Sequence, residues 1–127
     1  LHWLPVSWWV CGVGYALLLA GIGIVTWAEG VNKFFEVTVR IQTDRGHTVI
    51  DTGPYAIVRH PGYVGGILHA IGMALSLGSL WALIPAGIAS VVLIVRTQWE
   101  DQTLQEELNG YKDFAMRVRY RLIPGVW

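Results

Sequence analysis

The sequence predicts an all-α integral membrane protein with about three transmembrane helices, and two observations support this fold class. Only 14% of the 127 residues are Asp, Glu, Lys or Arg and 54% are hydrophobic, whereas a typical soluble domain has roughly 25% charged residues. The charges are also segregated, because residues 1–28 and 60–95 carry none. This pattern excludes a disordered chain and argues against an ordinary soluble domain. Nine basic residues balance nine acidic ones, so no nucleic-acid partner is expected.

The length allows a single domain, which covers residues 1–127. The one cysteine, Cys11, excludes an internal disulfide and any metal site that needs several cysteines. Because Cys11 lies in the first uncharged block, we expect it to be a small buried apolar residue. The chain begins with Leu1 and continues directly into apolar sequence, so we expect an N-terminally incomplete or processed chain.

The first predicted span covers about residues 6–27. The 22 residues from Val6 to Trp27 carry no charge, and about 20 apolar residues cross a bilayer core. Tryptophans lie near both ends of this run, as in the aromatic belts of membrane proteins. The run also contains small residues that allow another helix to approach closely: Gly12, Gly14, Gly21 and Gly23.

The second uncharged block predicts a tight helical hairpin. Its 36 residues are too many for one span and suit two short spans, at about 63–78 and 82–98. Gly78 and Ser79, followed by Pro85, are typical of the turn between them.

One span followed by a hairpin brings both charged segments, 29–62 and 96–127, to the same side of the membrane. All nine Lys and Arg residues lie in these two segments. Positive charge is enriched on the cytoplasmic side of membrane proteins, so we expect this side to face the cytoplasm.

The connector after the first span is predicted to be ordered. Apolar and polar residues alternate from Phe35 to Gln42, which favours a strand, although a helix in the membrane interface stays open. Turn residues at 44–46 precede a short apolar return at 47–50, and a second turn follows at 52–55. The pattern predicts a small hairpin on the membrane surface.

Beyond the last span, we expect a C-terminal amphipathic helix. Leu104, Leu108 and Tyr111 share one helical face, and Gly110 is expected to end or kink that helix. A second short amphipathic piece follows, with Phe114 on its apolar face. Three arginines in this piece are expected to attract anionic lipid headgroups: Arg117, Arg119 and Arg121.

The mouths of the hairpin carry a candidate site. Because a hairpin brings its two ends together, His60, Tyr63, Arg96 and Glu100 can share one pocket. Plainer alternatives stay open: Arg59 and Arg96 can snorkel to the interface, and Arg96 and Glu100 can form an ion pair within one helix. A metal site is not expected, since the histidines and acidic residues have no ligand spacing.

The order of motifs over about residues 40–124, roughly two thirds of the chain, resembles the isoprenylcysteine carboxyl methyltransferase family. The resemblance lies in V-x-I-Q, H-T-V-I, T-G-P-Y, R-H-P-G-Y and R-T-Q-W-E-D. It implies a cytosolic-face site for S-adenosylmethionine as cofactor, and Arg96 as the substrate carboxylate anchor. Arg59 joins Arg96 as a candidate catalytic residue. The residues implied to bind the cofactor are Gln42, His47, Thr48, Val49, Ile50, Tyr55, His60, Pro61, Gly62, Tyr63 and Glu100.

Two positions depart from the motifs of this family. Its second glutamate is Asp101 here. The third residue of its H-P-x-Y motif is Gly62, so any side-chain contact from that position is lost.

The resemblance implies methyl transfer to a lipophilic acceptor, such as the carboxylate of a prenylcysteine or another isoprenoid acid. A phospholipid amine as the acceptor stays open, and so does a non-catalytic membrane subunit. A third alternative is an NADPH-dependent membrane sterol or enone reductase, because residues 118–124 resemble the end of those proteins. The partners expected are a lipophilic or lipidated substrate and membrane lipid.

Overall fold

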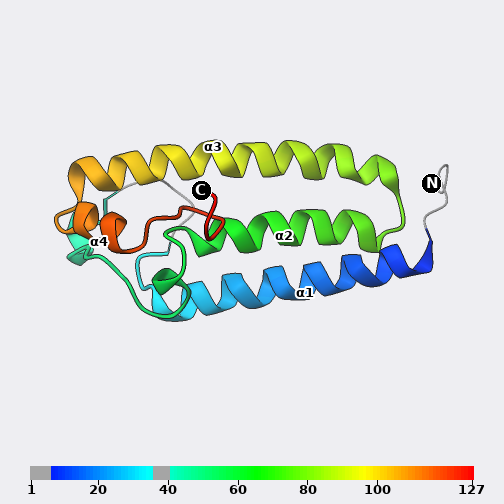
Figure 1. Cartoon of the computed structure of the whole chain (residues 1–127), viewed down its shortest axis with the longest axis horizontal. Coiled ribbons are helices and arrows are strands. Elements are labelled where there is room, and N and C mark those ends of the chain that lie inside the picture. The colour runs from blue at the N-terminus through cyan, green and yellow to red at the C-terminus, as the bar shows by residue number, and fades with distance from the viewer. Residues whose placement is uncertain (1–6, 36–40) are drawn as a thin grey trace.

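The chain forms three long helices side by side, with its polar segments gathered at one end (Figure 1). The computed structural model describes residues 7–35 and 41–127, and this part of the chain contains helices and turns but no strand. The α-helices of these described residues are α1 (Trp8–Val31), α2 (Pro61–Ser76), α3 (Leu83–Glu107) and α4 (Tyr111–Arg117). Short 3-10 turns lie between α1 and α2, η1 (Thr43–Arg45) and η2 (Gly53–Ala56), and between α2 and α3, η3 (Leu80–Ala82).

Two of the long helices are long and apolar enough to cross a membrane. They are Trp8–Val31 and the stretch Leu80–Glu107, and only 11% of the apolar window of each is buried. A helix in the core of a soluble protein would be mostly buried, so these outward-facing side chains suit lipid. α2 has 16 residues and lies between α1 and α3 (Figure 1). The all-helical membrane fold is confirmed, whereas the count of three spans stays a prediction.

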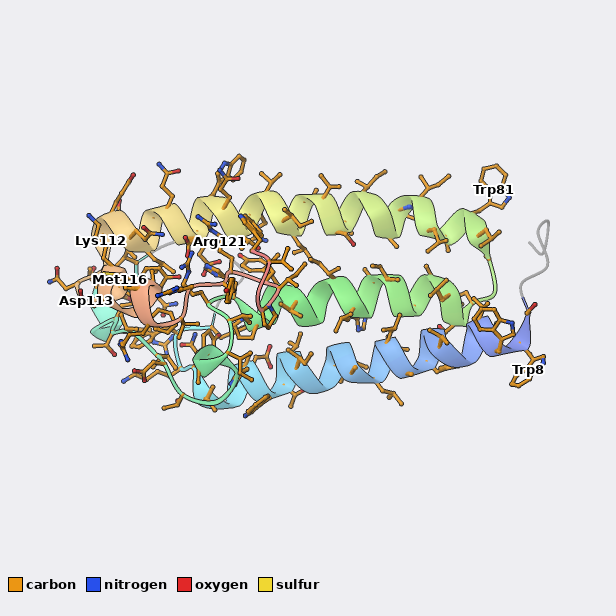
Figure 2. All side chains as sticks on the ribbon, in the orientation of Figure 1. Trp8, Trp81, Lys112, Asp113, Met116 and Arg121 are labelled. Atoms are coloured by element: carbon orange, nitrogen blue, oxygen red, sulfur yellow. The ribbon has the colours of Figure 1, made fainter. Side chains whose placement is uncertain are left out.

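Exposed tryptophans mark both ends of the two long helices. Trp8 and Trp81 lie at the end opposite the polar segments (Figure 2), and Trp27 and Trp99 lie toward the polar end. All four are exposed. At 1.5 Å per residue, Trp8 and Trp27 are separated by about 28 Å along α1, close to the thickness of a bilayer core of about 30 Å.

α1 and α2 pack with their backbones in contact, because two glycines of each helix face the other. Gly21 lies opposite Gly65, and a Cβ atom built on Gly21 would be 2.6 Å from the Gly65 carbonyl oxygen. Gly14 lies opposite Gly72, where a Cβ atom on Gly72 would be 2.8 Å from the Gly14 oxygen. At both positions the facing backbone is too close to leave room for a side chain. The two helices can therefore approach this closely only because these residues are glycines.

Two expectations about single segments are corrected. The surface hairpin is not formed in the described residues: residues 47–50 belong to no strand, and residues 43–45 form η1. Backbone groups there bond locally instead, since the His47 amide donates to the Gln42 carbonyl. Residues 36–40 of the expected strand lie outside the described residues. Cys11 is half-buried rather than buried, because much of α1 faces outward.

The core sits at the polar end and joins segments that are distant in sequence. Ala28 of α1 and Tyr55 of η2 pack there with three residues after α3, Leu108, Tyr111 and Phe114. α3 ends at Glu107 and α4 begins at Tyr111, after Gly110 adopts a φ of 85°. The C-terminal segment then returns toward α2, where the amides of residues 59 and 60 donate to the carbonyls of residues 120 and 121. These contacts make the polar end one packed unit.

Candidate functional site

A cavity of about 230 Å³ lies at the polar end, between the connector, the start of α2, the end of α3 and α4. Twelve of the thirteen site residues expected from the sequence line it: Gln42, His47, Thr48, Val49, Ile50, Tyr55, Arg59, His60, Gly62, Tyr63, Arg96 and Glu100. The thirteenth, Pro61, is buried as the first residue of α2. A missing amide hydrogen costs nothing at that position, so Pro61 starts the helix that orients its neighbours.

The two mouths of the hairpin meet through Tyr63 and Glu100. The Tyr63 hydroxyl of α2 donates to the Glu100 carboxylate of α3 at 2.5 Å. The Arg96 guanidinium, one turn before Glu100, lies 5.8 Å from the centre of the Tyr63 ring. This wall of the cavity therefore combines an anion, a cation and an aromatic ring within a few ångströms.

Tyr55 also lines the cavity and is held by the residue that follows α1. Its hydroxyl oxygen accepts a hydrogen bond from Asn32 Nδ2 at 2.9 Å. Burial, opposed by the Asn32 bond and assisted by the Glu100 charge, raises the pKa of Tyr55 to about 12. The phenol is therefore protonated at neutral pH, and its own hydrogen is available to donate.

Gln42 and His47 organise the connector wall. Gln42 is 1% exposed, its Nε2 donates to the Phe34 carbonyl at 2.7 Å, and its Oε1 accepts from Arg45 at 2.8 Å. The backbone amide of Gln42 donates to His47 Nδ1 at 3.0 Å. The His47 ring stacks on Phe34 with ring centres 4.4 Å apart. Gln42 thus fixes the backbone and the ring that face the cavity.

Arg59 and His60 are buried, so the snorkelling alternative for Arg59 is wrong. Arg59 is 6% exposed and His60 is 5% exposed. Arg59 donates to Asp101 through Nε and Nη2, both at 2.9 Å, and its Nη1 reaches three backbone carbonyls after α3. His60 Nε2 is also 2.9 Å from Asp101 Oδ1. A bidentate guanidinium pair of this kind fixes orientation as well as charge.

The departure at Gly62 is compensated by a residue from the connector. A Cβ atom on Gly62 would be 2.9 Å from Cζ of Phe35, and Phe35 itself lines the cavity. The aromatic ring therefore occupies the space that a side chain at position 62 would fill.

Sequence reasoning missed several cavity residues, all supplied by tertiary contacts: Asn32, Phe34, Phe35, Leu93, Leu104, Leu108, Tyr111 and Phe114. The amphipathic spacing of Leu104, Leu108 and Tyr111 was a usable indication, since it marks a face that must be covered. For Asn32 and Phe34 the sequence carries no comparable pattern.

The donor set suits an organic cation more than a metal. Within the described residues, no group of three or more His, Cys, Asp or Glu side chains is placed to hold a metal ion. One carboxylate beside several aromatic rings attracts a cation by charge and by ring quadrupole.

The phospholipid methyltransferase family model matches residues 9–109 of this chain. Protein-S-isoprenylcysteine O-methyltransferase B of Arabidopsis thaliana is 24% identical over 122 residues, which are 91% of this chain and 60% of that protein. A probable protein-S-isoprenylcysteine O-methyltransferase of Oryza sativa subsp. indica is 31% identical over 127 residues, 91% of this chain and 62% of that protein.

A third similar protein is a Delta(14)-sterol reductase of Mus musculus. It is 32% identical over 91 residues, which are 68% of this chain and 22% of the reductase. The chain spans less than two thirds of the length of each of these curated relatives.

Proposed function

Because this chain belongs to the phospholipid methyltransferase family, we propose that it transfers a methyl group from S-adenosylmethionine to a lipophilic carboxylate. A prenylcysteine or another isoprenoid acid is the expected acceptor, in line with the names of two relatives. One observation carries the proposal: the motif residues of distant segments converge on one cavity at the polar end of the apolar helices. Because the relatives are longer, the complete activity is a proposal for this chain.

The residues around the cavity fit the proposed cofactor. S-adenosylmethionine supplies, when bound, a methyl group activated by a positive sulfonium. Glu100 offers a carboxylate for its ammonium, and Tyr55 and Tyr63 offer ring faces and hydroxyls to a cationic ligand. The protonated phenol of Tyr55 adds a hydrogen-bond donor for the carboxylate or ribose of the cofactor.

A carboxylate acceptor needs no strong base, because it is already ionised at neutral pH. The residues of this chain then act by orienting the acceptor and excluding water from the cavity. Arg96 is the proposed anchor of the acceptor carboxylate, because a guanidinium binds a carboxylate with two parallel hydrogen bonds. The proposed role of Arg59 is to hold the cavity wall through Asp101.

The protein is proposed to lie in the membrane with the cavity toward the cytoplasm. Two apolar helices with outward-facing side chains support the membrane position. The orientation rests on the nine Lys and Arg residues, all of which lie in segments 29–62 and 96–127.

Two measurements on the full-length protein in detergent test the proposal. Calorimetry should detect binding of S-adenosylmethionine and of its demethylated product. Incubation with methyl-labelled cofactor and membrane extract should label an acid-derived methyl ester, identified by mass. Arg96→Gln should lower labelling while cofactor affinity stays within about threefold of wild type. Absence of cofactor binding would contradict the proposal. Label found only on a phospholipid amine would mean that the acceptor is that amine and not a carboxylate.

The similarity to the sterol reductase favours a second candidate, an NADPH-dependent reductase. Titration of the protein with NADPH, followed by tryptophan fluorescence, separates the two candidates. The methyltransferase proposal expects quenching or a shift with S-adenosylmethionine and none with NADPH. A stable protein partner that co-purifies, with neither ligand bound, would instead favour a non-catalytic subunit.

A further inference from the structure

A buried carboxylate stands behind the cavity wall and joins the segments that build it. Asp101 is 1% exposed and does not line the cavity. Its oxygens accept hydrogen bonds from five side chains of the segment before α2, of α3, of α4 and of the C-terminal segment: Arg59, His60, Gln105, Tyr111 and Arg121. A carboxylate shared by so many donors organises groups beyond itself.

The hydrogen bonds around Asp101 indicate which ring nitrogen of His60 carries a proton. His60 Nε2 is 2.9 Å from Asp101 Oδ1 and 3.3 Å from the Tyr111 hydroxyl oxygen. The Tyr111 hydroxyl donates its own hydrogen to Asp101 Oδ1 at 2.9 Å. An ionised carboxylate only accepts hydrogen bonds, so His60 Nε2 must be the donor. Burial and the Asp101 charge raise the pKa of Tyr111 well above its usual value, which keeps this hydroxyl protonated.

The other ring nitrogen of His60, Nδ1, is open to a ligand. Within residues 7–35 and 41–127, His60 Nδ1 has no protein partner. In the same residues every fully buried side-chain nitrogen and oxygen has a hydrogen-bond partner. Because Nδ1 has none, it is not fully buried. His60 lines the cavity, so a ligand bound there lies beside its ring. A neutral imidazole with its proton on Nε2 presents a lone pair at Nδ1.

We propose that Asp101 is a positioning residue that keeps the His60 proton on Nε2 and so presents Nδ1 to the bound S-adenosylmethionine as a hydrogen-bond acceptor. The proposal rests on the proposed function for the identity of the ligand. The ammonium, adenine and ribose of that cofactor all carry N–H or O–H donors. Asp101 acts through His60, in the way that carboxylates behind a metal site orient its histidine ligands.

The same carboxylate fixes the wall on the side of α4. Arg59, held bidentately by Asp101, donates to the carbonyls of Ala115, Val118 and Arg119. Arg121 binds the second Asp101 oxygen at 3.2 Å. A change at Asp101 therefore acts on the cavity from two directions, through His60 and through the segment after α4.

The first test measures the His60 ring directly. Nitrogen NMR of the full-length protein with ¹⁵N-labelled histidine, without ligand, should find the neutral His60 ring protonated at Nε2. A His60→Gln variant assigns the signal. A proton on Nδ1 would overturn the proposal. This measurement needs no cofactor, so failure of the proposed function and failure of this inference give different results.

The second test compares two substitutions at Asp101 with a matched surface control. Asp101→Asn should weaken S-adenosylmethionine binding at least about tenfold and change the His60 ring signals. Asp101→Glu, which keeps the carboxylate, should restore affinity to within about threefold of wild type. The control, Asp51→Asn, removes an exposed carboxylate paired with Arg117 and should leave both readouts unchanged.

Two outcomes would overturn the positioning role. One is a folded Asp101→Asn protein with wild-type affinity. The other is lost affinity with an unchanged His60 ring, since a merely structural role would give that result. If Asp101→Asn does not fold, the wild-type ring measurement still decides, together with Tyr111→Phe. Tyr111→Phe keeps the carboxylate and should keep the proton on Nε2; a shift to Nδ1 there would contradict the role of Asp101.

Discussion

The contact between α1 and α2 and the polar end of the molecule are held together by opposite means. Between the helices the backbones touch, because glycines such as Gly21 and Gly65 leave no side chain to separate them. At the polar end, charged and polar side chains are buried and bound to one another around Asp101.

The difference follows from what each region must do. Apolar side chains gain nothing by leaving lipid for protein, so two helices in a membrane associate through close packing of small residues. The polar end buries charged and polar groups around its cavity, and each of these costs free energy unless it is hydrogen-bonded. The helix contact fixes the positions of the two backbones, and the polar network fixes the orientation of the side chains at the polar end.

The largest effect is expected when the close helix contact is broken. Gly72→Val places a side chain against the α1 backbone, where even a Cβ atom would be 2.8 Å from the Gly14 oxygen. We expect a loss of at least about 4 kcal/mol of stability, or no folded protein, because neither backbone can give way. Thermal unfolding in detergent measures this loss.

Gly23→Val is the matched control for that substitution. It lies on α1, and a Cβ atom there would have nothing within 4 Å. Similar unfolding temperatures for Gly72→Val and Gly23→Val would mean that the glycine contact does not hold the helices.

The next largest effect is expected from removing the buried guanidinium of the polar network. Arg59→Met leaves Asp101 without its bidentate partner and three carbonyls without a donor. We expect a loss of about 3 kcal/mol, the usual cost of breaking a buried ion pair. Denaturant unfolding with a tryptophan fluorescence readout measures it.

Arg117→Met serves as the control for Arg59→Met, because its ion pair with Asp51 is exposed and should contribute less than about 1 kcal/mol. Equal losses in the two variants would remove the distinction between the buried network and the surface.

A smaller effect, on binding rather than stability, is expected at Glu100. Glu100→Gln keeps the shape of the side chain but removes its charge, so the affinity for S-adenosylmethionine should fall by about 2 kcal/mol, roughly thirtyfold. Glu107→Gln, on the same helix and exposed, should bind the cofactor like wild type. Calorimetry on both variants distinguishes an effect of the Glu100 carboxylate in the cavity from an effect of surface charge in general. Unchanged affinity in Glu100→Gln would contradict the proposed pairing of Glu100 with the ammonium of the cofactor.

The smallest effect is expected from the buried phenol of Tyr55. Burial raises its pKa from an ordinary value of 10.0 to about 12, so the folded state binds its proton more tightly than the unfolded state. Its contribution is fully present below pH 10 and is lost between about pH 10 and 12. Near pH 11 the loss is about 1 kcal/mol.

Unfolding measured from pH 8 to 11.5 tests this titration. Tyr55→Phe should be less sensitive to alkaline pH than wild type, although it loses the hydrogen bond from Asn32. Parallel pH curves for the two proteins would contradict a raised pKa for Tyr55.

Much of the fold and of the candidate site was predictable from sequence, for a physical reason. A bilayer excludes charge, so the two uncharged blocks predict apolar helices and the charges predict where they end. The hairpin then brings its two mouths together, and twelve of the thirteen expected residues do line one cavity. The surface hairpin expected in the connector was wrong at its return segment, residues 47–50, because a short apolar run forms a strand only where a partner strand exists.

The hydrogen-bond partners of the polar groups follow from the packing of distant segments. The charge pattern alone places Arg59, His60, Glu100 and Asp101 at the same end of the molecule. It did not distinguish Glu100, which faces the cavity, from Asp101, which lies behind the wall. The two acids are adjacent on α3, so they point in different directions. Burial and hydrogen-bond partners depend on segments far away in sequence, and only the packed molecule brings those segments together.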